Sequence, residues 1–175
     1  KDVDNTHILP MLSPFEESGC EVRQLGGALN IMAPRHLGAV RHIRTMPYPG
    51  FPTDAQPIVM SMAAVGSGTS IFVENIFENR YKHAEELERL GARIKVEGKV
   101  AIVEGVEQLF GAPVTSYDLR GGAALVVAAL AAQGRTEISG TRYIHRGYED
   151  IAGNLSSLGA RIREFAGSGE PEAEE

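Results

Sequence analysis

The fold is best predicted from residues 53–96, TDAQPIVMSMAAVGSGTSIFVENIFENRYKHAEELERLGARIKV. The chain repeats the same order of sequence features further on. Residues 117–164, YDLRGGAALVVAALAAQGRTEISGTRYIHRGYEDIAGNLSSLGARIRE, follow the same order. Each segment contains an aspartate-led apolar helix, a glycine stop, a Thr-containing strand, an arginine loop, a second helix and LGARI. Matching aspartates, arginines and glycines are 64, 66 and 68 residues apart, a longer period than most solenoids have. The pattern predicts a closed domain of a few α/β units.

A shorter copy precedes these two, because residues 17–33 (ESGCEVRQLGGALNIMA) parallel residues 89–105 (RLGARIKVEGKVAIVEG). Residues 56–65 and 119–132 are apolar nearly all round, which predicts buried helices. Residues 81–90 carry charges on one side and predict a helix nearer the surface. Runs rich in β-branched residues predict short strands at residues 70–74, 93–96, 100–103 and 136–139.

Composition excludes several classes of function. The 175 residues carry a formal net charge of -6 with a pI near 5.4, which argues against a general nucleic-acid binder. The single cysteine, Cys20, excludes a disulfide framework and fits a reducing, cytoplasmic setting. The apolar run at residues 121–132 is too short to span a bilayer, so no membrane partner is expected. The five histidines lack metal-ligand spacing, and we expect neither a metal nor a cofactor.

Charged residues at helix starts are the candidate functional groups. Thr53 and Asp54 precede a predicted helix, and Asp118 holds the equivalent place in the next repeat. Aspartate at such a position is typical of a helix N-cap. Arg80 and Arg146 occupy equivalent loops before helices, where free amides and the helix dipole favour anions. Taken singly, such arginines are most often solvated or in surface salt bridges.

Arg120 lies in the first turn of an otherwise apolar helix. Its planar guanidinium suits carboxylate and phosphate groups. An acidic protein needs local arginines to hold an anionic substrate, so Arg80, Arg120 and Arg146 are the predicted anion-binding residues.

Four separated segments carry a family resemblance: TMPYPGFPTDAQ (45–56), IFENR (76–80), YDLRGG (117–122) and HRGYE (145–149). In order and spacing they resemble the signature segments of the UDP-N-acetylglucosamine enolpyruvyl transferases, over about residues 10–165. Two positions depart from the family pattern. His145 stands where aspartate is usual, which bears on the orientation of Arg146, and Gly121 stands where alanine is usual.

The resemblance implies an α/β fold, an inside-out α/β barrel domain built from repeated βαβαββ units and here incomplete. Residues 1–166 would form the C-terminal domain, with a partial unit at 1–44, a full unit at 45–115 and a third unit at 116–166. Residues 167–175 are expected to be a disordered acidic tail. The start of the polypeptide and the whole first domain would be missing, so the fragment is expected to be inactive alone.

The resemblance also implies a reaction. The enolpyruvyl group of phosphoenolpyruvate would pass to the 3-hydroxyl of UDP-N-acetylglucosamine with release of phosphate, the first committed step of peptidoglycan synthesis. Asp54 would lie near that hydroxyl and accept its proton late, because a helix start stabilises the carboxylate. This role and the capping role can coexist. Asp118 would combine capping with electrostatic support.

The remaining implied site residues bind substrate. Arg120 and Arg146 would approach phosphoenolpyruvate, and Arg146 would also take part in catalysis. Arg80 would help to hold the substrates, and Ile76 would meet the uridine side through its backbone. Cys20 matches Ala92 and Ala160 in the repeats and is expected only to pack. Two alternatives stay open: a stand-alone nucleotide-sugar-binding module, and a structural repeat domain without catalysis.

Overall fold

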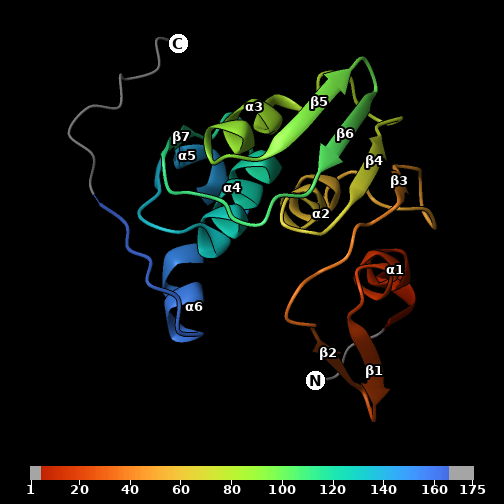
Figure 1. Cartoon of the computed structure of the whole chain (residues 1–175). Coiled ribbons are helices and arrows are strands. Elements are labelled where there is room, and N and C mark those ends of the chain that lie inside the picture. Colours follow the sequence, from red (N-terminus) through yellow and green to blue (C-terminus); the bar gives the residue numbers. More distant parts are fainter. Residues whose placement is uncertain (1–4, 166–175) are drawn as a thin grey trace.

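The second repeat forms a complete unit in a computed structural model that describes residues 5–165 (Figure 1). Its elements follow the order βαβαββ: β3 (His42–Arg44), α2 (Gln56–Ala63), β4 (Thr69–Val73), α3 (Lys82–Arg89), β5 (Arg93–Glu97) and β6 (Val100–Glu104). The sheet has the order β3-β4-β6-β5, with β3 parallel to β4 and the other neighbours antiparallel. The unit order predicted from the sequence is confirmed here.

The third repeat begins in the same way. It contains β7 (Pro113–Thr115), α4 (Leu119–Ala131), β8 (Glu137–Ser139), α5 (Arg142–His145) and α6 (Ile151–Ser157). Strands β7 and β8 pair in parallel, as β3 and β4 do. Within residues 5–165 this sheet has two strands, because residues 161–165 adopt no regular structure.

The first, partial repeat supplies only the later elements of a unit. A short 3-10 helix, η1 (Asn5–His7), leads into α1 (Leu9–Glu17), β1 (Glu21–Leu25) and β2 (Ala28–Met32). The two strands form an antiparallel hairpin, which matches β5 and β6 of the second repeat. Cys20 is 7% exposed and its counterpart Ala92 is also 7% exposed, so the predicted packing role of Cys20 is confirmed.

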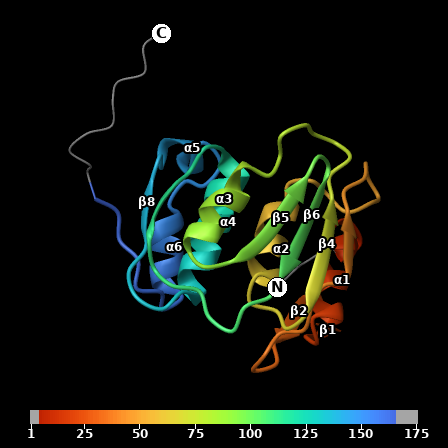
Figure 2. The ribbon, with the colours of Figure 1, turned by 45° about the horizontal axis from the view of Figure 1, so that its top comes forward.

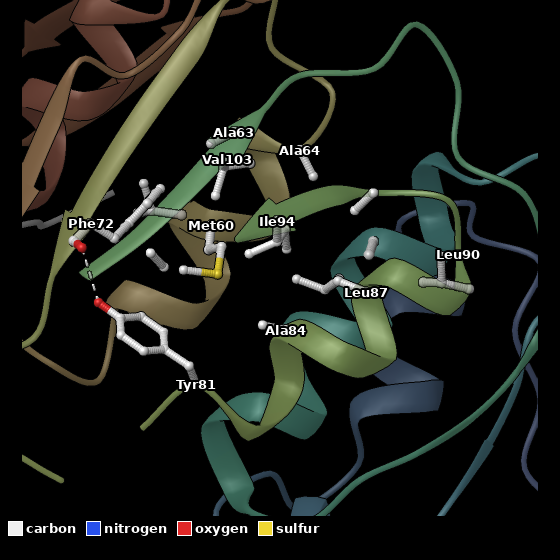
Figure 3. Close-up of a cluster of buried hydrophobic side chains, with 14 of the residues drawn as sticks. Met60, Ala63, Ala64, Phe72, Tyr81, Ala84, Leu87, Leu90, Ile94 and Val103 are labelled. Carbon is white, nitrogen blue, oxygen red and sulfur yellow. Dashed lines mark hydrogen bonds between the residues drawn. The ribbon is translucent and has the colours of Figure 1, made fainter. Parts of the chain in front are cut away.

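The core lies between the four-stranded sheet and the helices beneath it. Phe72, Ile94 and Val103 point from the sheet toward Met60 of α2 and Leu87 of α3 (Figure 3). Helix α4 packs against both α2 and α3, and Figure 2 shows α2 behind the sheet and α4 behind α3. The prediction that the two apolar helices are buried inside is confirmed for α2 and for the first half of α4, whereas the second half of α4 is partly exposed.

Helix α3 is two-sided. His83, Ala84, Glu86 and Leu87 face the interior, whereas the other four residues of the helix are exposed. The predicted strands form within one or two residues of their expected ends. The predicted acidic tail at 167–175 lies outside the described residues, and no described helix is long and apolar enough to cross a membrane.

Candidate active site

Asp54 lies two residues before α2 and binds two arginines from different repeats. Its Oδ1 accepts a hydrogen bond from Arg80 Nη2 at 3.0 Å, and its Oδ2 accepts one from Arg120 Nη2 at 2.8 Å. The Asp54 side chain is 55% exposed, and those of Arg80 and Arg120 are 16% and 31% exposed. One carboxylate and two guanidinium groups therefore share an accessible cluster.

The capping role predicted for Asp54 is wrong. Helix α2 has Ala55 at its N-cap without a side-chain hydrogen bond, and the Asp54 carboxylate is turned to the arginines instead. The reason lies in Pro57, which has no N–H for a cap to bind. The backbone N–H of Gln56 donates to the Thr53 carbonyl at 3.3 Å, so this donor is satisfied without Asp54.

The capping role predicted for Asp118 is confirmed. Its Oδ1 accepts from the backbone N–H of Arg120 at 3.0 Å and of Gly121 at 2.8 Å. This cap fixes the first turn of α4, from which the Arg120 side chain reaches Asp54. A methyl group on Gly121 would lie 3.0 Å from Asp118 Oδ2 and 3.1 Å from His83 Cβ, so the glycine suits the closely packed cap.

Arg120 is held as a cation. Its hydrogen bond to Asp54, helped by the attraction of that carboxylate and by Tyr148, raises the pKa of its guanidinium, although partial burial opposes the shift. Tyr148 belongs to the HRGYE segment, and a methyl on neighbouring Gly147 would lie 2.7 Å from Leu119 Cδ2. The segment therefore packs against the start of α4.

Arg146 is the predicted site residue that the structure does not join to the cluster directly. It follows the short helix α5 and is exposed, and its side chain makes no hydrogen bond or ion pair within residues 5–165. It is two residues from Tyr148, which contacts Arg120. Neighbouring His145 is turned elsewhere, since its Nε2 lies 2.5 Å from Glu164 Oε1. At the helix after this loop, Asp150 caps α6 by accepting from Gly153 N–H.

Ile76 lies on the loop that leads to Arg80. Its backbone N–H donates to Glu74 Oε1 at 2.9 Å, and its side chain is partly exposed. The ring of Phe77, beside it, lies under the Arg80 guanidinium at 5.3 Å. The contact of the Ile76 backbone with the uridine side of the substrate stays a prediction.

Two buried ionisable residues near the cluster were not singled out from the sequence. Glu74 is 1% exposed and follows β4 directly. His83 is 2% exposed, and burial lowers the pKa of its imidazole to about 4, against an opposing pull from the Asp118 charge. For Glu74 the available signal is an acid at the end of an apolar run, whereas His83 lies among charged residues and gives no such signal.

A cavity of about 950 Å³ lies away from the cluster. It is bounded by the second half of α4, by β8, by α6 and by residues 161–165. None of Asp54, Arg80, Arg120 or Arg146 lines it. In the part of the chain that the structure describes, no group of three or more His, Cys, Asp or Glu side chains could hold a metal ion.

Residues 3–155 match the family model described as EPSP synthase (3-phosphoshikimate 1-carboxyvinyltransferase). The chain belongs to this family. Within it, the most similar relatives support the resemblance to the enzymes that act on UDP-N-acetylglucosamine. A protein from Desulfofundulus thermocisternus named UDP-N-acetylglucosamine 1-carboxyvinyltransferase is 52% identical over 156 residues, which cover 89% of this chain and 64% of the relative.

Other relatives carry the same name and are longer. One from Caldanaerobacter subterraneus subsp. tengcongensis, numbered 2, is 48% identical, with 89% of this chain and 37% of the relative covered. One from Thermotoga maritima is 46% identical, with 93% and 38% covered. The chain thus spans well under two thirds of the length of these relatives.

Solved structures bear out the predicted fold class. The enolpyruvyl transferase NikO from Streptomyces tendae matches with a TM-score of 0.80 and 30% identity, over 89% of this chain and 36% of that one. An EPSP synthase from Acinetobacter baumannii matches with a TM-score of 0.56 and 16% identity, over 78% and 33%. The second likeness is one of fold. The α/β enolpyruvyl transferase fold is confirmed.

Proposed function

We propose that this chain is the C-terminal part of an enzyme that transfers the enolpyruvyl group of phosphoenolpyruvate to the 3-hydroxyl of UDP-N-acetylglucosamine and releases phosphate. In this proposal the enzyme acts in the cytoplasm and commits the nucleotide sugar to peptidoglycan synthesis. The observation that carries the proposal is the carboxylate of Asp54 between Arg80 and Arg120. The family and the names of the relatives support the same reaction.

The proposed roles follow from charge and access. Phosphoenolpyruvate carries a carboxylate and a phosphate, and the guanidinium groups of Arg120 and Arg146 offer paired donors to such anions. In this structure Arg120 donates a hydrogen bond to Asp54 Oδ2. If Arg120 binds an anionic substrate instead, Asp54 Oδ2 loses this partner. Asp54 then accepts the proton of the sugar 3-hydroxyl while the oxygen of that hydroxyl attacks the second carbon of the enolpyruvyl group.

The other site residues support this step. Asp118 holds the first turn of α4 and contributes a fixed negative charge near the positive charge that develops on the three-carbon unit. Arg80 keeps Asp54 in place and faces the anionic substrates. Ile76 offers its backbone to the uridine side. Addition also needs a proton at the methylene carbon, which in this proposal an acid of the missing first domain supplies, and it forms a tetrahedral ketal. Elimination from that ketal removes one proton from the new methyl group, restores the double bond and releases the phosphate.

A larger polypeptide is part of the proposal. In the second repeat β4 pairs with β6, but in the third repeat β8 pairs only with β7 among residues 5–165. The cavity along β8 and residues 161–165 has room for further polypeptide. We infer that the start of the parent chain completes this unit, and that a first domain closes over Asp54 and supplies the rest of the active site.

The test is a phosphate-release assay with phosphoenolpyruvate and UDP-N-acetylglucosamine. The proposal expects turnover by the longer polypeptide that contains this sequence and none by the 175-residue chain alone. Turnover by the short chain would contradict the division of labour. Binding of UDP-N-acetylglucosamine by the longer polypeptide without phosphate release would instead favour the nucleotide-sugar-binding module, and absence of both would favour the structural repeat domain.

A further inference from the structure

We propose that Glu74 is a positioning residue for the reaction, because it ties together the two loops that present Asp54 and Arg80. This inference rests on the proposed function. Glu74 follows β4, is 1% exposed, and makes no hydrogen bond or ion pair with Asp54, Arg80 or Arg120 among the described residues. It therefore acts through its neighbours, and those neighbours belong to both loops.

One Glu74 oxygen collects three hydrogen bonds. Oε1 accepts from the Thr45 hydroxyl at 2.9 Å and from the backbone N–H groups of Ile76 at 2.9 Å and Phe77 at 3.1 Å. Thr45 in turn accepts from the backbone N–H of Asn75 at 2.9 Å. These bonds fix the start of the loop at residues 74–80, which ends at Arg80, against the start of the loop at residues 45–53.

The other Glu74 oxygen reaches the far end of the second loop. Oε2 accepts from the Thr53 hydroxyl at 3.0 Å, and Thr53 is the residue before Asp54. The two loops are joined again where Asp54 Oδ1 meets Arg80 Nη2 at 3.0 Å. A closed ring thus runs from Glu74 to Thr53, along the chain to Asp54, across the ion pair to Arg80, and back to Glu74 along residues 76–80.

A carboxylate suits the centre of this ring because all four of its partners donate. An ionised carboxylate only accepts, and it has about four lone-pair sites for the purpose. Hydrogen bonds to a charged acceptor are about twice as strong as neutral ones. The residue therefore holds Thr53 at one orientation, and this orientation sets the direction from which the Asp54 carboxylate faces the arginines.

The test compares Thr53→Val with Thr53→Ser in the longer polypeptide that contains this chain. Valine is close to threonine in shape but cannot donate to Glu74 Oε2, whereas serine can. Thr69→Val is the matched control, since Thr69 is an exposed threonine on β4 outside the site. We expect Thr53→Val to lower kcat about 10²-fold through misplacement of Asp54. KM for UDP-N-acetylglucosamine should stay within about three-fold, and Thr53→Ser should return kcat to within about three-fold of the unaltered enzyme.

A second readout does not need catalysis. In the isotope-labelled 175-residue chain, the guanidinium resonances of Arg80 report its pairing with Asp54. They should shift in Thr53→Val and stay in place in Thr53→Ser and Thr69→Val. If the unaltered longer polypeptide releases no phosphate, the proposed function fails and these resonances alone decide the role of Glu74. The inference is overturned by an unshifted Arg80 signal in Thr53→Val, by an unchanged kcat in that variant, or by a serine variant as slow as the valine one.

Discussion

The start of α2 and the start of α4 occupy equivalent places in two repeats, yet their aspartates have different partners: one binds arginine side chains and the other binds backbone N–H groups. Asp118 binds the backbone N–H groups of Arg120 and Gly121, two and three residues further on. The equivalent positions after Asp54 are Gln56, whose N–H is bonded to Thr53, and Pro57, which has no N–H. Asp54 is left free to bind Arg80 and Arg120.

The difference shows how one repeated plan can yield both a structural and a reactive carboxylate. The oxygens of an aspartate that caps a helix are bonded to the backbone N–H groups of that helix. An aspartate at the same place that does not cap keeps its oxygens for other partners. The capped helix α4 also supplies a partner for Asp54, because Asp118 fixes the turn from which Arg120 reaches Asp54. Four predictions sharpen this comparison.

The largest expected effect is on turnover. Asp54→Ala in the longer polypeptide should lower kcat about 10²- to 10⁴-fold, the usual contribution of a general base, while binding of UDP-N-acetylglucosamine stays measurable. Steady-state phosphate release and calorimetry check the two halves. Near-normal turnover in this variant would remove the proposed base and leave the two aspartates with no functional difference.

The next effect concerns the arginine that links the two helix starts. Arg120→Ala should weaken capture of phosphoenolpyruvate by about 2–5 kcal/mol, as expected for a charged contact that becomes buried on binding. KM for phosphoenolpyruvate measures it, and Arg146→Ala should act in the same direction. Loss of affinity for the nucleotide sugar alone would show that these arginines serve the other substrate.

The third effect depends on pH and on His83, which packs beside the start of α4. Because burial lowers its pKa to about 4, the folded chain binds its proton less readily than the unfolded chain, where the pKa is near 6.5. The free energy of unfolding should therefore fall by about 3 kcal/mol as pH drops from 6.5 to 4. Urea unfolding of the 175-residue chain across this range checks it, and His83→Gln should remove that part of the slope.

The smallest effect is the loss of the cap. Asp118→Ala should lower the free energy of unfolding by about 1 kcal/mol, a drop in Tm of about 2–4 °C. Calorimetry on the 175-residue chain measures it. Asp54→Ala, which removes no cap, is the matched comparison. An equal loss of stability in both variants at constant ionic strength would contradict the claim that Asp118 caps its helix and Asp54 does not.

The repeat made most of the fold predictable. Apolar helices, short strands and glycine stops recur at nearly constant offsets, and the observed elements end within one or two residues of the predicted ones. The repeat also singles out Asp54, Arg80 and Arg120 as candidate groups, but it does not predict that they pair with one another. Aspartate at a helix start predicts a cap in both repeats. The cap is absent at Asp54 because Pro57 lacks one of the backbone N–H donors that a cap would bind.

Other parts of the site depend on contacts that no local pattern encodes. Glu74 joins Thr45, Thr53 and Ile76 only because β3 and β4 lie side by side. The short helix α5 before Arg146 was not predicted, since only four residues form it. The burial of His83 depends on α4, which begins 36 residues later in the chain.

The most direct measurement is one nuclear magnetic resonance comparison of the labelled 175-residue chain with its Asp54→Asn variant, in which backbone amides and arginine side chains are observed together. If Asp54 serves the arginines, the guanidinium signals of Arg80 and Arg120 shift and the amide of Gln56 does not. A shifted Gln56 amide with undisturbed guanidinium signals would show that Asp54 caps α2 after all, and would contradict the account.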